Sequence, residues 1–158
     1  MLISTVIMTV LLIPFLYFLP TTASVEFAGK QYLTGRWKIF GCVVAGLWAG
    51  AAIGCITEVF TSNKYRPVIN LAEACRMGPA SNIILGLALG YFSTIIPILI
   101  LAGVIWFSFA FVGMYGVALA ALGMLGCLPI ALTMDGYGPI SDNAGGISEM
   151  SYLNNSVR

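Results

Sequence analysis

The sequence contains no histidine and few charges. Only 8% of its 158 residues are charged, and seven basic residues nearly balance six acidic ones. Without histidine there is no Ser-His-Asp or Cys-His catalytic arrangement and no imidazole-based zinc site. A net charge of +1 provides no basic surface for nucleic acid. The four cysteines form no CxxC pair, so their spacing indicates neither a disulfide nor a metal cluster.

Apolar residues dominate what is present. They make up 59% of the chain, and the mean hydropathy is +0.98, whereas a soluble domain carries about 25% charged residues. We therefore expect an all-α, polytopic transmembrane helix bundle embedded in the lipid bilayer. Four apolar runs predict its spans, at about residues 1–19, 39–60, 81–111 and 117–142. A signal peptide is the alternative for the first run, but no Lys or Arg precedes its apolar part.

The connectors between the first three runs are polar. Residues 20–38 and 61–80 each carry three positive charges, so the positive-inside count does not set the orientation. Residues 69–76 predict a short surface helix that Gly78 and Pro79 end. A turn is expected at Gly113–Gly116, and a kink at Pro129.

Small residues recur four positions apart inside the predicted spans, which lets helix backbones approach closely in lipid. We expect a helix-packing role for these glycines: Gly46, Gly50, Gly54, Gly86 and Gly90.

Three acidic residues follow 58 uncharged residues, at strict seven-residue spacing: Asp135, Asp142 and Glu149. On a helix, seven residues turn through roughly 700°, so the carboxylates would share one face. Pro139 lies between the first two acids. Two alternatives stay open, because Gly, Pro, Asp and Asn are typical both of a loop leaving a membrane helix and of a helix end with an ionic role.

The full string from Asp135 to Met150 carries more information than its spacing. It reads Asp-Gly-Tyr-Gly-Pro-Ile-Ser-Asp-Asn-Ala-Gly-Gly-Ile-Ser-Glu-Met, and it resembles a signature of the membrane-bound, ion-pumping inorganic pyrophosphatases. Upstream stretches look like the same family in the same order, including Gly46-Leu-Trp-Ala-Gly, Thr57-Glu-Val-Phe-Thr-Ser and Gly86-Leu-Ala-Leu-Gly-Tyr. The resemblance covers residues 40–150 closely and 1–39 more loosely, and it is strongest to the plant vacuolar type.

The resemblance implies an enzyme that hydrolyses inorganic pyrophosphate with Mg2+ and couples this to pumping H+ or Na+ out of the cytoplasm. Such pumps are larger helix bundles that work as homodimers, and some members need K+. By resemblance, Asp142 binds the magnesium–pyrophosphate complex on the cytoplasmic side of a vacuolar or other internal membrane. Asp135, Asn143 and Glu149 match family positions that would support Asp142 or tune the ion path. The residues that activate the attacking water have no counterpart here.

The chain departs from the family pattern in its extent. The Asp- and Lys-rich helices of the family are missing, and Gly126-Cys127 replaces an expected Ser-Thr pair. We expect a fragment, a truncated product or an incomplete gene model, and no hydrolysis by the isolated chain. The alternative function is a small four-helix membrane protein with a structural or assembly role and no catalysis. The acidic string favours the pump, because packing alone does not require three acids in register.

Overall fold

The computed structural model describes residues 2–27 and 29–154, and only the backbone of Ala23 and Lys30. The chain divides into two compact units, Met1–Gly126 and Cys127–Arg158. Three helical segments of the described residues are long and apolar enough to cross a membrane, and Leu2–Phe18 is a shorter apolar helix. These segments are Arg36–Met77, Pro79–Val112 and Met114–Met150. The predicted class, an all-α transmembrane bundle, is confirmed; the limits of the spans in a membrane stay predictions.

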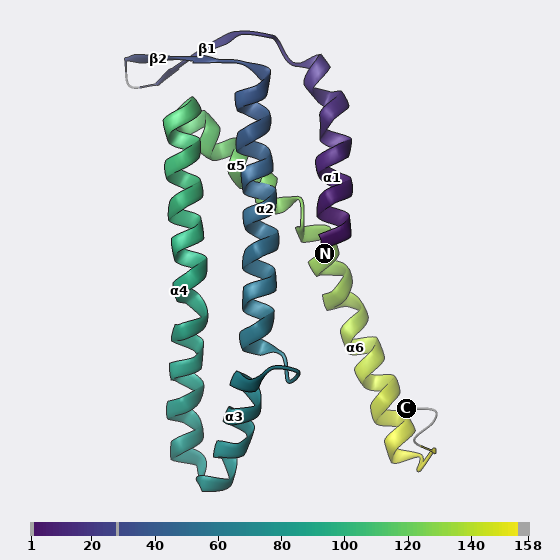
Figure 1. Cartoon of the computed structure of the whole chain (residues 1–158). Coiled ribbons are helices and arrows are strands. Elements are labelled where there is room, and N and C mark those ends of the chain that lie inside the picture. Colours follow the sequence, from purple (N-terminus) through teal and green to yellow (C-terminus); the bar gives the residue numbers. More distant parts are fainter. Residues whose placement is uncertain (1, 28, 155–158) are drawn as a thin grey trace. The chain divides into compact units, whose positions relative to one another are not determined.

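The first apolar run forms α1, Leu2–Phe15, followed by one turn of 3-10 helix, η1, Leu16–Phe18 (Figure 1). Its 14 residues rise about 21 Å, less than the roughly 30 Å of a bilayer core. A polar contact joins α1 to α2, because the Trp48 indole N–H donates to Thr9 Oγ1 at 3.2 Å.

A β-hairpin occupies the first connector, which the sequence predicted only as a polar link. Strands β1, Ala23–Phe27, and β2, Lys30–Thr34, pair antiparallel with Val25 opposite Tyr32. Gly29 in the turn has φ +74°, a conformation that glycine adopts without steric cost. The hairpin is a small addition to an otherwise helical chain, and the predicted all-α class holds.

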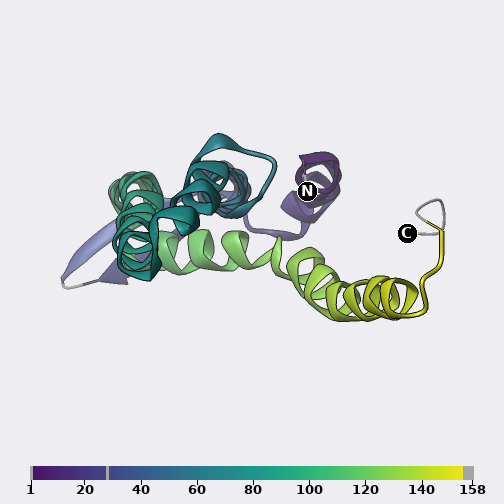
Figure 2. The same cartoon turned by 90° about the horizontal axis from the view of Figure 1, so that it is seen from below.

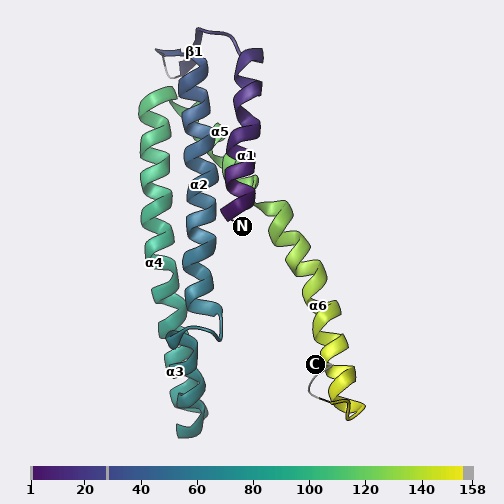
Figure 3. The same ribbon diagram turned by 45° about the vertical axis from the view of Figure 1, so that its right-hand side comes forward.

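The long helices α2, Arg36–Thr61, and α4, Pro79–Val112, lie side by side (Figure 3). Along the chain, α2 and α4 are connected by α3, Arg66–Ala74, and by the 3-10 turn η2, Cys75–Met77. This confirms the short helix predicted in the second connector, with an earlier start. Figure 1 shows the hairpin and α3 at opposite ends of α2, so α2 separates the two connectors.

Helix α5, Met114–Leu125, runs across α2, which Figure 2 shows nearly end-on. Small residues line the crossing. A Cβ atom at Gly46 would collide with the backbone carbonyl of Ala120, and one at Gly123 with the carbonyl of Val43. One turn further along α2, a Cβ at Gly50 would lie 3.2 Å from the Met124 carbonyl oxygen. Both helices thus give up side-chain volume at the crossing, the geometry expected of small residues at four-residue spacing.

The core of the first unit lies where α2, α4 and α5 meet. Cys42, Ser108 and Val112 are fully buried there, and Leu47 nearly so. Elsewhere the long helices bury little, and in α4 only Ser108 and Val112 are buried. Such apolar exposure suits helices whose outer faces contact lipid or further helices.

The range predicted as one span, 117–142, contains two helices. Helix α5 ends at Leu125, and α6 runs over Leu128–Met150. The expected kink at Pro129 explains the break, because a proline ring clashes with the carbonyl four residues earlier, that of Leu125. The preceding turn is tighter than predicted, since Gly113 alone, at φ +70°, separates α4 from α5.

Candidate functional site

The acidic string is helical. Helix α6 continues without interruption through Asp135, Pro139, Asp142 and Glu149. This decides between the two structures that the composition left open, in favour of the helix. Residues seven apart on a helix drift by only about 20° and rise about 10 Å. The three carboxyl-bearing positions therefore form one stripe along α6.

Pro139 alters the backbone inside this stripe. It has no N–H to donate to the Asp135 carbonyl, and its ring crowds that oxygen. Proline is tolerated in membrane helices because other groups can satisfy the freed carbonyl. The backbone therefore presents an additional acceptor close to the Asp135 side chain.

Two hydroxyl groups of α6 have hydrogen-bond partners within the helix, whereas two of its carboxylates have none among the residues that the structure describes. Thr133 Oγ1 donates to the Pro129 carbonyl at 2.8 Å, and Ser148 Oγ donates to that of Gly145 at 2.7 Å. The structure records no hydrogen bond or ion pair for the Asp135 and Asp142 side chains among residues 2–27 and 29–154. An ionised carboxylate is costly in hydrocarbon, so these two groups require water, a cation or a partner.

The acidic residues of α6 do not by themselves make a metal site. No three or more His, Cys, Asp or Glu side chains gather closely enough to hold a metal ion in the described part of the chain. Mg2+ keeps several waters and takes one or two carboxylates plus phosphate oxygens from its substrate. Exposed Asp142, with exposed Asn143 beside it, fits one ligand position of such an ion and not a complete site.

The other predicted residues have separate surroundings. Glu149 lies near the end of α6, one residue before Met150. Gly46 and Gly50 lie in the α2–α5 crossing, whereas a Cβ at Gly86 would lie 3.9 Å from Leu71 Cδ1 of α3. A Cβ at Gly90 would meet no atom of another element within 4 Å among the described residues. Gly54 lies one turn beyond Gly50 in α2.

Two features were missed in the sequence. The glycines of α2 pack against small residues of α5. The four-residue spacing of Gly116 and Ala120 in the sequence indicated this second packing surface. A cavity between α1 and α2 contains Arg36 and Trp37. The sequence signals for it were the aromatic residues at the end of the first apolar run and the basic–aromatic pair Arg36–Trp37.

Comparison with known proteins places the whole chain in one family. A family model described as inorganic H+ pyrophosphatase matches residues 1–158. A protein of Clostridium tetani named putative K(+)-stimulated pyrophosphate-energized sodium pump is 46% identical over 132 residues, which are 78% of this chain and 20% of that protein. The K(+)-insensitive pyrophosphate-energized proton pump of Methanosarcina mazei is 38% identical over 135 residues, covering 80% of this chain and 20% of its own length.

A shorter relative covers more of its own length. The pyrophosphate-energized proton pump 2 of Mycoplana dimorpha is 40% identical over 116 residues, which are 73% of this chain and 56% of that protein. The chain spans about a fifth of the length of the first two relatives. These matches favour a pump segment over a small structural membrane protein. The chain belongs to the inorganic H+ pyrophosphatase family of membrane proteins.

Proposed function

We propose that this chain is a segment of a membrane pump that hydrolyses inorganic pyrophosphate and moves H+ or Na+ across the membrane. The observation that carries the proposal is α6, which continues as a helix through a family-matching string and exposes Asp142. Both ions are named because the relatives are called sodium pumps and proton pumps.

Asp142 would bind the substrate through a metal. Pyrophosphate is too negative to approach a carboxylate unless a cation bridges them. Bound Mg2+ would neutralise the charge that develops on the phosphate oxygens. The Asp142 carboxylate would hold one side of this complex and orient it. It is not assigned as the base, because it would be occupied as a ligand.

The neighbouring polar residues would support Asp142. The Asn143 amide follows it directly and would fix the position of the carboxylate or of the bound anion. Asp135 and Glu149 lie one heptad before and after Asp142 on the same stripe, and they would extend its negative field along the ion path. The remaining ligands and the base would come from other helices of the pump.

The surroundings follow from the family resemblance. Asp142 and the α3 connector would face the cytoplasm, and the hairpin would lie on the opposite side. The membrane would be that of a vacuole or another internal compartment, and the pump would be a homodimer. One relative is named K(+)-stimulated and another K(+)-insensitive.

The test is a chimera in which this chain replaces the matching segment of the Methanosarcina mazei pump. We expect Mg2+-dependent pyrophosphate hydrolysis, which Asp142→Asn lowers by about 100-fold or more through loss of a charge-stabilising ligand. Glu73→Gln is the matched control, because it removes an exposed acid outside α6. An inactive chimera beside an active parent would contradict the function. Near-normal hydrolysis by Asp142→Asn would contradict the role of Asp142 alone.

A further inference from the structure

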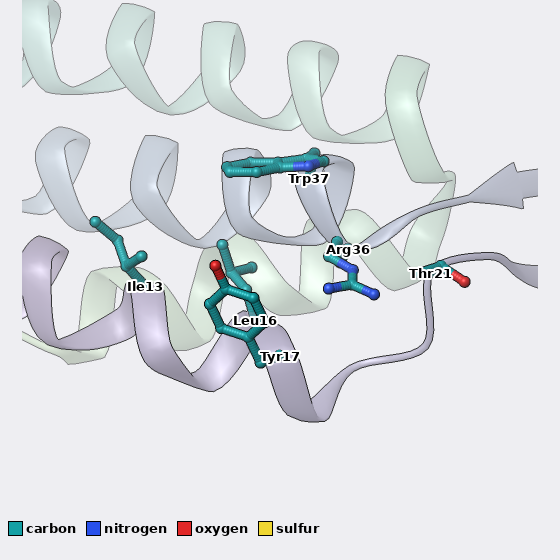
Figure 4. Close-up of a pocket in the computed structure, with 6 residues that line it drawn as sticks. All are labelled: Ile13, Leu16, Tyr17, Thr21, Arg36 and Trp37. Carbon is teal, nitrogen blue, oxygen red and sulfur yellow. The ribbon is translucent and has the colours of Figure 1, made fainter.

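A cavity of about 470 Å³ lies between the end of α1 with η1 and the start of α2 (Figure 4). This volume is within the range of about 300–1,000 Å³ that small-molecule sites occupy. Its lining combines aliphatic, aromatic and cationic side chains: Ile13, Leu16, Tyr17, Thr21, Arg36 and Trp37. The cavity therefore has an apolar wall and one positive group.

Arg36 supplies the positive charge. It is the first residue of α2 and is half-buried, and Figure 4 shows its guanidinium projecting from α2 into the space beside η1. Among the residues that the structure describes, no acidic side chain lines the cavity. Within the described ranges, the structure records no hydrogen bond or ion pair for the Arg36 side chain. A planar guanidinium matches carboxylate and phosphate oxygens in geometry and charge, so the site favours an anion.

Lys38, two residues later, is different. Its ammonium donates to the Leu33 backbone carbonyl at 2.9 Å. Lys38 does not line this cavity but a separate one beside Phe107 and Phe111. The two cations thus have the same charge and nearly the same level in the fold, but only Arg36 is available to a ligand in this cavity.

Aromatic residues locate the cavity relative to the bilayer. Tyr17, Phe18 and Trp37 are 79%, 86% and 70% exposed. Trp and Tyr gather at the level of the lipid headgroups, where one end of the ring is apolar and the other is wet. The polar hairpin follows on one side and the apolar run of α1 on the other, so we expect Arg36 at headgroup depth and Ile13 deeper.

We propose that this cavity binds an anionic membrane phospholipid, with Arg36 paired to the phosphate and an acyl chain along Ile13 and Leu16. Inorganic phosphate shares the headgroup chemistry. The lipid is the occupant argued for, because the cation continues directly into an apolar wall at the membrane boundary.

The first experiment uses the full polypeptide purified from its membrane and stripped of lipid. Native mass spectrometry follows the binding of phosphatidylglycerol, phosphatidylcholine and inorganic phosphate. We expect preferential phosphatidylglycerol binding, weakened about tenfold by Arg36→Gln through loss of a charge-assisted contact and unchanged by Lys38→Gln. Equal loss in both variants overturns the proposal, as does no loss in Arg36→Gln. Inorganic phosphate that competes at the same concentration as the lipid also overturns it.

The second experiment leaves Arg36 intact and compares two lipids on the same variant. Trp48→Phe and Trp106→Phe leave Trp37 as the only indole of the three in the sequence. In nanodiscs, a phosphatidylglycerol brominated on its acyl chain should quench Trp37 fluorescence more strongly than an equally brominated phosphatidylcholine at the same fraction. Equal quenching by the two lipids contradicts selection of the headgroup, and absence of quenching contradicts lipid in the cavity.

Discussion

The backbone carbonyl of Ala120 occupies the space into which a side chain at Gly46 would extend. The relationship is mutual, because the carbonyl of Val43 takes the corresponding space at Gly123. In lipid there is little hydrophobic gain when two helices meet, so close backbone packing supplies much of the association. This crossing is therefore the main tertiary contact of the first unit.

Gly46→Ala should destabilise the protein. The added methyl group meets backbone, which cannot rotate away, so α2 and α5 must separate at a cost of about 1–3 kcal/mol. The measurement is the unfolding temperature in detergent. Gly41→Ala is the control on the same helix, because its Cβ has no neighbour within 4 Å among the described residues and alanine favours helix by about 1 kcal/mol. Equal behaviour of the two variants would contradict the crossing.

Gly113→Ala should also destabilise the protein, for a different reason. Gly113 has φ +70° and ψ −153°, a conformation that costs other residues about 1–3 kcal/mol. The Tyr32 ring adds crowding, since a Cβ at Gly113 would lie 3.1 Å from it.

A double-mutant cycle with Tyr32→Ala separates these two contributions. Removal of the ring relieves the crowding but not the backbone strain. Most of the loss caused by Gly113→Ala should therefore persist in the Tyr32→Ala background. Full recovery of the unfolding temperature would show that the ring alone requires glycine.

The helices were predictable from the sequence because a bilayer allows few alternatives. Backbone N–H and C=O groups must be satisfied within the segment, so apolar runs become helices, and α2 at Arg36–Thr61 extends the run at 39–60 by only a few residues. The hairpin was not predicted, because its residues are mixed in polarity. A tertiary contact holds the hairpin in place, since the Tyr32 ring packs edge-on against Phe109 of α4, with ring centroids 6.5 Å apart.

The candidate site was predictable in part. The seven-residue spacing places Asp135, Asp142 and Glu149 on one face only if the string is helical, and Pro139 argued equally for a loop. Local rules could not decide this, because membrane helices tolerate proline that a soluble helix rejects. Spacing in one chain also cannot show ligands that other helices would supply.

Pro139→Ala should make α6 more stable and the pump slower. Alanine restores the backbone N–H that donates a hydrogen bond to the Asp135 carbonyl. It is also about 3 kcal/mol more favourable than proline inside a helix. The substitution also straightens the helix and so changes the orientation of Asp142 relative to Asp135. Because of this change, we expect pyrophosphate hydrolysis by the chimera to fall approximately 10- to 100-fold. Pro97→Ala, which makes the same change in α4, should leave hydrolysis near normal. Equal losses in both variants would remove any special role of Pro139.

The two connectors should lie on opposite sides of the membrane, because α2 separates them. The test places a single reactive cysteine in a background with Ala at the other cysteine positions: either exposed Cys75 or Glu26→Cys on β1. In sealed vesicles, an impermeant maleimide should label only one of the two, and the other only after permeabilisation. Labelling of both from the same side would show that α2 does not span the bilayer.

The contact of Tyr32 with Gly113 and Phe109 sets an order on biosynthesis. The hairpin emerges from the ribosome before the residues that support it, since Gly113 comes 81 positions after Tyr32 in the chain. At about 5–20 residues per second, this interval is roughly 4–16 s. During that time the two strands have only each other, and an isolated two-stranded hairpin is at best marginally stable in water. The hairpin therefore gains its tertiary support only when α4 is complete, and a chaperone or a protease has that interval in which to act on it.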